Sequence, residues 1–414
     1  MEDQRKTHRR NFLHMLGTVS AAASIDLLTK GSLLKLNAAY AAELAENPLL
    51  AGRPLVRYPQ KTELILLTSR PPQLETPMKY FETAITPNDA FYVRYHIYPP
   101  ADIDVSQWRL RIGGQVEQEL QLSIDDLRNG FPRTSIVAVN QCSGNSRGYS
   151  SPRVFGGQWA NGAMGNAEWT GVRLRDILSK ARVKQGAVDV TFDGLDKPQM
   201  PSVPDFVKSL SVSHAMEDPN VLVAYEMNGQ PLPLLNGFPA RLIVPGWYAT
   251  YWVKNLSDIN VLDHPFDGFW MTKAYLIPDT PCGCIEPGAA PAHAVPINRM
   301  NVRSFLISTQ EGARIPVNRE TVMKGIAFDG GYGIQDVFVS TDSGETWQRG
   351  TLGRDWGNYS FREWSFNWTP RRPGKCVLMV RAVNRVGESQ PDQRIWNPAG
   401  YMQNFVERVS VSAA

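Results

Sequence analysis

The feature that most limits the fold of this chain is a change in the pattern of apolar and turn-forming residues near residue 295. After this point, short runs with alternating apolar residues are separated by turns rich in Gly, Pro, Asp and Ser. Three aromatic residues at alternate positions, Trp364, Phe366 and Trp368, are expected to face one side of a strand. The strand-like runs are 321–328, 336–340, 361–368 and 376–383. This pattern, over roughly 120 residues, predicts an all-β sandwich of immunoglobulin-like size.

The sequence before residue 295 mixes strands with short helices. Ser123 is a good N-cap for a helix over 124–127, and the apolar residues of 172–181 recur at helical spacing. Residues 42–90 are rich in Pro and polar residues, so we expect an extended segment on the surface. Apolar runs predict strands at 107–112, 135–139, 188–192, 221–226 and 241–244. The chain therefore predicts a mixed α+β domain followed by an all-β domain.

The first 41 residues have the features of an export signal. Arg9-Arg10 is followed by Asn-Phe-Leu, a modest apolar stretch and a small-residue cleavage motif at 39–41. The pattern is similar to the twin-arginine signal, which exports proteins already folded, often with an inserted cofactor. His14 and Asp26 interrupt the apolar stretch, so no membrane span is predicted. We expect a periplasmic protein that carries a cofactor.

The net charge of the chain comes from this leader. Residues 1–41 contain six Lys or Arg and three Asp or Glu, while the whole chain contains 43 and 40. The remaining residues therefore hold 37 of each sign. A net charge of zero gives no reason to expect nucleic acid or a membrane surface as a partner.

The four cysteines, at positions 142, 282, 284 and 376, are too sparse for a disulfide framework in a chain of 414 residues. Cys376 lies in a strand-like run and is expected to be a buried thiol. Cys282 and Cys284, with His293, could form part of a zinc site, but the paired spacing and a fourth ligand are missing. A zinc site is therefore not expected there, and the role of these two cysteines is left open.

Cys142 stands between the strand-like run 135–139 and a segment of small and polar residues. A lone cysteine in this position is most often a small buried apolar residue. Arg147 follows five residues later, and Arg94 lies two residues before His96 in another strand-like run. If strand ends bring these residues together, a thiolate faces two guanidinium groups. Such a pocket lowers the pKa of a thiol and attracts a small oxyanion.

Six motifs of the chain resemble the sulfite oxidase family of molybdenum enzymes, in the order seen in that family. They are FYVRYH at 91–96, QCSGNSR at 141–147, AEWTGVRLRD at 167–176, AYEMNGQPLP at 224–233, GFPAR at 237–241 and IWN at 395–397. The resemblance covers essentially the whole chain after the leader. It implies a mixed α+β molybdopterin-binding catalytic domain over 42–290 and an immunoglobulin-like dimerisation domain over 291–414.

The resemblance also implies a role for ten residues. Cys142 would be the thiolate ligand of molybdenum, and the other sulfur ligands would come from molybdopterin, a pyranopterin dithiolene. The substrate pocket would be lined by Arg94, Arg147 and Tyr275, with Trp169 as a wall. The pterin and its phosphate would be held by His96, Arg241, Lys254, Asp196 and Asn236. Each of these residue types also has a purely structural use in a protein core.

Two departures from the family pattern concern charge. Asn236 stands where animal members have a histidine before the Gly-Phe-Pro motif, and an amide can bind a phosphate but brings no positive charge. Pro398 and Ala399 stand where a further pocket arginine is expected after Trp-Asn. The substrate pocket should therefore be less positive, which affects substrate affinity more than reaction type. The Pro-Ala-Gly segment favours the bacterial sulfite dehydrogenase branch.

The activity implied is the oxidation of sulfite to sulfate. The chain has no Cys-x-x-Cys-His motif for covalent haem, so we expect electrons to pass to a separate c-type cytochrome. The sequence does not identify this acceptor, and it leaves open whether the C-terminal domain forms a homodimer or a heterodimer.

Three alternatives have features that separate them. A molybdenum-dependent methionine sulfoxide reductase would share the leader and the cysteine but lack the C-terminal sandwich. Assimilatory nitrate reductase has both domains but is cytosolic and fused to haem and flavin modules. A periplasmic binding protein without cofactor would keep Cys142, Arg94 and Arg147 without purpose, and metal content would exclude it.

Overall fold

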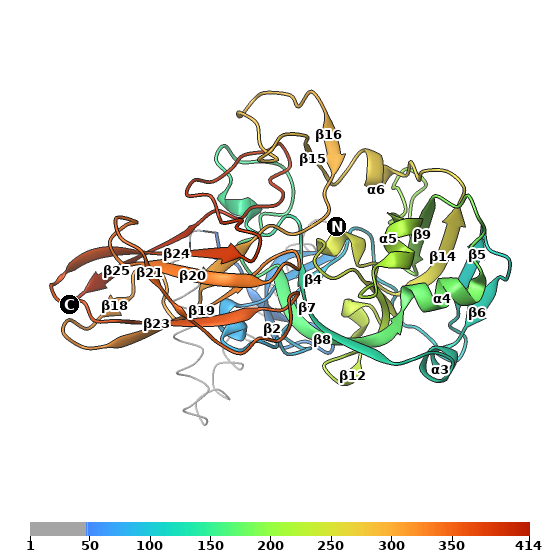
Figure 1. The fold of residues 1–414 in the computed structure, drawn as a ribbon, viewed down its shortest axis with the longest axis horizontal. Helices are drawn as coiled ribbons and strands as arrows, with labels where there is room; N and C mark the ends of the chain where they lie inside the picture. The colour runs from blue at the N-terminus through green and yellow to red at the C-terminus, as the bar shows by residue number, and fades with distance from the viewer. Residues whose placement is uncertain (1–46, 48) are drawn as a thin grey trace, which may run out of the picture. The chain divides into compact units, whose positions relative to one another are not determined.

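The computed structural model describes residues 47 and 49–414. The export signal expected over 1–41 lies outside the described residues and stays a prediction. From Arg53 to Ala414 the chain forms one compact unit (Figure 1). Among the described residues, no helix has the length and apolar character needed to cross a membrane.

A four-stranded antiparallel sheet forms the first part of the mixed domain. Its strands, in order, are β1 (Leu55–Arg57), β2 (Glu63–Ser69), β3 (Pro72–Glu75) and β4 (Val93–Arg94). Leu64, Leu74, Val93 and Tyr95 form a small core of their own. The expectation of an extended surface segment over 42–90 is therefore wrong for this part, because the strands bury apolar side chains together.

Two further sheets form the centre of the mixed domain. One has the order β10 (Lys208–Ser211), β9 (Asp189–Gly194), β14 (Leu256–Leu262), β5 (Leu110–Gly114) and β6 (Leu120–Leu122). The other has the order β12 (Gln230–Pro231), β11 (Leu222–Met227), β8 (Met164–Arg173) and β7 (Thr134–Gln141), with β13 (Arg241–Ile243) paired to β11. Ile112 and Val190 of the first sheet share one core with Ala167 and Val223 of the second. The five predicted strands are confirmed, with shifted ends.

Within residues 49–414, the helices are few and short. Ser123 caps α3 (Ile124–Asn129) as predicted, and Asp126 completes a capping box. The second predicted helix is α4 (Leu174–Ala181), which buries its apolar face against the sheets. The other helices are α5 (Val212–Glu217), α6 (Phe269–Thr272) and the 3-10 turns η2 (Met78–Phe81), η3 (Arg147–Tyr149), η4 (Leu234–Asn236) and η5 (Ala249–Tyr251). The described chain is mostly sheet, so the predicted label α+β overstates its helices.

The C-terminal domain consists of two sheets around a shared core. One sheet has the order β17 (Arg303–Leu306), β19 (Thr321–Phe328), β23 (Arg362–Trp368) and β22 (Thr351–Leu352). The other has the order β18 (Arg314–Ile315), β25 (Glu407–Ala413), β24 (Gly374–Asn384), β20 (Ile334–Ser340) and β21 (Gln348–Arg349). Met323 and Trp364 of the first sheet meet Val337 and Val380 of the second. The likeness to immunoglobulin domains stays a prediction.

The two domains meet in a second apolar cluster. Met164, Tyr248 and Tyr275 of the first domain pack with Phe305 and Phe328 of the second. A short hairpin of β15 (Leu276–Pro278) and β16 (Ala294–Pro296) connects the domains. Because Tyr275 is also a predicted site residue, the C-terminal domain packs directly against a residue of the site.

Candidate active site

Cys142 lies immediately after β7, where the chain leaves the sheet. Its thiol is free and its residue is only 7% exposed. The backbone N–H of Cys142 donates to the carbonyl of Ala163, and the Cys142 carbonyl accepts from the N–H of Asn145, both at 2.9 Å. The position of the thiol is therefore fixed by the backbone on both sides.

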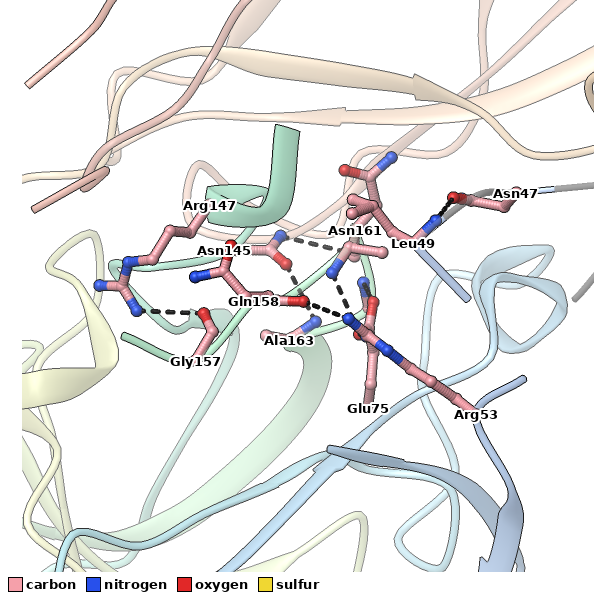
Figure 2. A network of polar contacts seen from close by, with 12 residues as sticks. Asn47, Leu49, Arg53, Glu75, Asn145, Arg147, Gly157, Gln158, Asn161 and Ala163 are labelled. Atoms are coloured by element: carbon pink, nitrogen blue, oxygen red, sulfur yellow. Dashed lines mark hydrogen bonds and ion pairs between the residues drawn. The ribbon is translucent and has the colours of Figure 1, made fainter. Parts of the chain in front are cut away.

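The loop from Cys142 to Arg147 is tied to the segment 157–163 (Figure 2). Asn145 donates from Nδ2 to the Asn161 carbonyl at 3.0 Å and accepts at Oδ1 from the N–H of Ala163 at 3.0 Å. A Cβ atom on Gly144 would come within 2.7 Å of the Arg147 guanidinium group, so a larger residue there would shift that group from its bond to the Gly157 carbonyl. These contacts explain why small and polar residues follow the cysteine.

A cavity opens at the thiol and collects seven of the ten predicted site residues. They are Arg94, His96, Cys142, Asn236, Arg241, Lys254 and Tyr275. Arg147, Trp169 and Asp196 do not line it. Among the described residues that line the cavity, three are cationic and none is Asp or Glu. The cavity therefore suits an anionic guest.

Several polar atoms on the cavity wall lack a partner in the described part of the chain. They are Nη1 of Arg94, Nδ2 of Asn140, Oγ of Ser143 and Oγ1 of Thr250, all buried. A buried donor without a partner costs about 1–3 kcal/mol. Such a cluster is expected where a polar group binds, since it would provide the missing acceptors.

Arg241 is held rigidly at the cavity wall. It donates to the Trp252 carbonyl at 3.3 Å, to the Asn236 carbonyl at 3.1 Å and to Asn140 Oδ1 at 3.5 Å. Its guanidinium group also lies against the rings of Trp169 and Trp252. Burial lowers the pKa of Arg241 to about 10, so it stays positively charged at neutral pH.

Lys254 lines the cavity, while Asp196 lies behind it. The ammonium group of Lys254 sits over the ring of Tyr95 at 4.4 Å. Burial lowers the pKa of Lys254 and raises the pKa of Asp196, and each charge partly opposes the effect on the other. Asp196 does not line the cavity, so its effect on a guest would be through charge, and Lys254 is the cation with the largest electrostatic effect on the pKa of Asp196.

His96 and Tyr275 form a pair on the cavity wall. The Tyr275 hydroxyl and Nε2 of His96 are 2.5 Å apart. The imidazole stacks on Phe206 and packs edge-on against Trp270, each with ring centroids 4.3 Å away. Burial, reinforced by the charge of Arg94, lowers the pKa of His96 well below its usual range, so the imidazole is neutral at pH 7. The partner of this ring in the structure is the Tyr275 hydroxyl, which the sequence does not predict.

Arg147 is buried beside the cavity and does not open into it. Its Nε donates to the Ala399 carbonyl at 2.7 Å, its Nη1 donates to the Gly157 carbonyl at 3.2 Å, and its guanidinium group lies over the Tyr401 ring. The segment that lacks the expected pocket arginine thus lies directly against Arg147. The backbone of Ala399 holds the arginine in place.

Trp169 does not form the predicted pocket wall. It is fully buried on β8, its Nε1 donates to the Ala138 carbonyl at 3.1 Å, and its ring packs edge-on against Phe91 and Trp252. The inward side of a central strand places this side chain in the core. Its ring packs against the guanidinium group of Arg241 instead.

Sequence reasoning missed two buried lysines near the site. Lys61 donates to the side chain of Asn236, and Lys208 lies over the ring of Tyr275 at 5.4 Å. Lysine is usually solvent-exposed, so neither residue stood out. For Lys208 a signal did exist, because it shares its strand face with buried Leu210 two residues later.

Cys282 and Cys284 form a disulfide bond, with their Cα atoms 5.1 Å apart. The role of these two cysteines, which the sequence leaves open, is therefore to form this bond, and neither sulfur is available as a zinc ligand. No group of three or more His, Cys, Asp or Glu residues that could hold a metal occurs in the described part of the chain. Cys376 is free, as predicted, and half-buried rather than buried.

Comparison with known proteins gives two family matches. Residues 96–270 match the oxidoreductase molybdopterin binding domain, and residues 294–414 match the Mo-co oxidoreductase dimerisation domain. Together these matches cover well over half of the chain.

The similar proteins point to the same family. The chain is 32% identical to mitochondrial sulfite oxidase of Rattus norvegicus, over 88% of this chain and 68% of that protein. It is 32% identical to sulfite oxidase of Gallus gallus, over 89% of this chain and 81% of that protein. It spans 63% of the length of human mitochondrial sulfite oxidase, at 34% identity. The sulfane dehydrogenase SoxCD from Paracoccus pantotrophus has a similar structure, with a TM-score of 0.71, 26% identity and coverage of 86% and 87% of the two chains.

These matches agree with the geometry. A free buried cysteine, a cationic wall and unpartnered buried donors surround one cavity, and most of its lining, apart from Tyr92, Arg94 and Tyr275, lies in the residues that match the molybdopterin binding domain. We conclude that this chain belongs to the sulfite oxidase family of molybdenum enzymes and uses a molybdenum–molybdopterin cofactor.

Proposed function

We propose that this protein is a sulfite dehydrogenase that oxidises sulfite to sulfate and passes the electrons to a c-type cytochrome. One observation carries the proposal. Arg94 presents a buried, unpartnered Nη1 in the cavity that Cys142 also lines, and no carboxylate lines that cavity among the described residues. A dianion such as sulfite would satisfy this donor beside the thiol.

The cofactor would be held by residues of the same cavity. The Cys142 thiolate would bind molybdenum, and Arg241, Asn236 and Lys254 would bind the pterin and its phosphate. When bound, the molybdenum centre supplies the oxygen-atom transfer and the two-electron redox change. The protein therefore contributes mainly position and charge.

Each remaining residue contributes one part of that positioning. Arg94 binds the sulfite dianion, and Tyr275 orients it with a hydroxyl whose direction is fixed by neutral His96. Phe206, which stacks on His96 and lines the cavity, limits the access of water. Arg147 acts through its charge and by holding the loop after Cys142, because its donors point to the carbonyls of Ala399 and Gly157.

The decisive experiment is sulfite-dependent reduction of cytochrome c and of ferricyanide by the purified protein, with molybdenum quantified in the same sample. Turnover that scales with molybdenum content is expected. A molybdenum-loaded protein that is inert to sulfite would refute the proposal. That protein would then be tested for reduction of methionine sulfoxide.

We further propose that residues 294–414 join two copies of the chain. The support is the match of these residues to a dimerisation domain. Light scattering of the eluting protein is expected to give twice the mass of a single chain, which is 46.2 kDa with the leader and correspondingly less once the leader is cleaved. A single chain mass over the working concentration range would exclude a stable homodimer.

We also propose export to the periplasm by the twin-arginine route. Arg9 and Arg10 support it, as does the exposed disulfide of Cys282 and Cys284, since disulfides persist in oxidising compartments. Replacing both arginines with lysine should retain the protein in the cytoplasmic fraction. Unchanged periplasmic recovery would refute the route.

A further inference from the structure

Lys61 is a buried lysine that lies just before β2, and the resemblance to the family assigns no role to it. It is only 5% exposed. Its Nζ donates to the carbonyl of Asn88 at 2.7 Å, to the carbonyl of Phe91 at 3.0 Å and to Oδ1 of Asn236. All three donors of the ammonium group are thus used. Lys61 makes no ion pair with a carboxylate within the described residues, so its positive charge is not neutralised by direct contact.

Asn236 connects this ammonium group to the cavity. An ammonium group only donates, so the side-chain oxygen of Asn236 must face Lys61 and the NH2 group must point the other way. Nδ2 donates one hydrogen to the Tyr92 carbonyl at 3.1 Å, and its second hydrogen is left for a guest in the cavity that Asn236 lines. The main-chain carbonyl of Asn236 accepts from Arg241 at 3.1 Å. Asn236 therefore lies between two buried cations.

We propose that Lys61 supplies, through Asn236, the positive charge that residue 236 itself lacks, and so fixes the phosphate end of the pterin cofactor. The inference rests on the proposed placement of that phosphate at Asn236 and Arg241. It makes Lys61 a positioning residue: its charge polarises the amide, and the amide donates to the anion.

The burial of the site makes this charge effective. A unit charge a few ångströms away acts far more strongly inside a protein than in water. Burial lowers the pKa of Lys61 to about 7, and an anion bound at Asn236 favours the protonated form again. Binding of the phosphate and protonation of Lys61 therefore support each other.

A purely structural role is the competing explanation. Lys61 would then only tie the carbonyls of Asn88 and Phe91 to η4, and its removal would lower stability without a specific effect on the pterin. Three variants separate the two explanations. Lys61→Met removes the charge, Asn236→Asp neutralises it while keeping Lys61 in place, and Lys61→Met with Asn236→His returns a cation at position 236. Lys184→Met, at an exposed lysine of the same domain, is the matched control.

The readout is pterin per folded chain, measured by fluorescence after oxidative release, following gel filtration at about pH 6, below the pKa of about 6.5 of an unperturbed histidine. Loss of a charge-assisted hydrogen bond should weaken pterin retention by about tenfold or more in Lys61→Met and in Asn236→Asp. The double variant should regain most of its pterin, and Lys184→Met should match the wild type.

The outcomes are distinct. Wild-type pterin content in Asn236→Asp overturns the inference, even if Lys61→Met fails to fold. A double variant that folds but stays as depleted as Lys61→Met also overturns it. A wild-type protein without pterin would instead refute the cofactor placement on which the inference rests.

Discussion

Arg303 joins the C-terminal domain to the loop that follows Cys142, and replacing it tests whether that domain supports the site. The side chain is 1% exposed and lies on β17. It donates from Nη1 to the Gln403 carbonyl and from Nη2 to Oγ of Ser146 at 2.7 Å, and it lies over the ring of Phe305. Ser146 is the residue before Arg147 and has a positive φ of 67°.

Arg303→Met keeps most of the apolar contact with Phe305 and removes these two short hydrogen bonds, together with a longer one from Nη2 to Oδ1 of Asn161 at 3.4 Å. Each buried bond to a charged group contributes about 1.5–3 kcal/mol, which gives a loss of about 3–6 kcal/mol. Removing the cation also removes its cost of desolvation, so we expect the lower end, about 3 kcal/mol. The share of this lost unfolding free energy that depends on the hydrogen bond to Ser146 should be about 1.5–3 kcal/mol.

Urea unfolding of the wild type, Arg303→Met, Ser146→Ala and the double variant measures both quantities in a double-mutant cycle. The effect of alanine on the backbone at position 146 appears in both arms of the cycle and cancels. Arg314→Met, at an exposed arginine of β18, should leave stability unchanged within about 0.5 kcal/mol. A coupling energy near zero would mean that the two domains do not communicate through this pair, and the reasoning would be refuted.

Four other variants give sharp expectations. Arg94→Gln should raise the KM for sulfite by about tenfold or more with a smaller change in kcat, because it removes a charged donor to the substrate, and steady-state kinetics would show any different split. Cys142→Ser should abolish turnover, and normal activity in this variant would exclude the thiolate as the metal ligand. Burial lowers the pKa of Lys208 to about 7, so between about pH 7 and pH 10 the folded state binds fewer protons than the unfolded state. The free energy of unfolding should therefore rise with pH in this range, by at most about 1.4 kcal/mol per pH unit. Lys208→Met should remove this slope, as measured by urea unfolding at each pH. Replacing Cys282 and Cys284 with serine should cost no more than about 2 kcal/mol, since the disulfide closes a very short loop, and a larger drop in unfolding free energy would contradict this.

The sequence predicts the strands well because their signal is local. The run 321–328 coincides with β19, and 135–139 lies inside β7, since alternation and β-branched residues determine a strand wherever it packs. The segment 42–90 gives a mixed signal. Strand β3 contains Pro72 and polar residues and is held by its pairing with β2 and β4, whereas β2 carries the apolar run 64–67, which is itself typical of a strand.

Seven site residues at the cavity could be named from the family resemblance, but their partners could not. Nothing in the spacing of His96 predicts that its ring stacks on Phe206 and bonds the hydroxyl of Tyr275, because these residues lie more than 100 positions further along the chain. Trp169 is a different case. The family motif implies a pocket wall and leaves core packing open, and the position of Trp169 on β8 places its side chain in the core against Arg241.

The two departures from the family pattern have a common physical explanation. Asn236 stands where a histidine is expected, and Lys61, from a distant part of the chain, donates to it. Ala399 stands where an arginine is expected, and its carbonyl accepts from the distant Arg147. A motif records only which residue stands at a position, while an anion responds to the sum of the charges around it. A missing arginine or histidine therefore cannot be taken as a loss of binding until the residues that contact that position have been identified. In this chain, Lys61 contacts Asn236 on the cavity wall, and Arg147 is held beside the cavity by the carbonyls of Ala399 and Gly157.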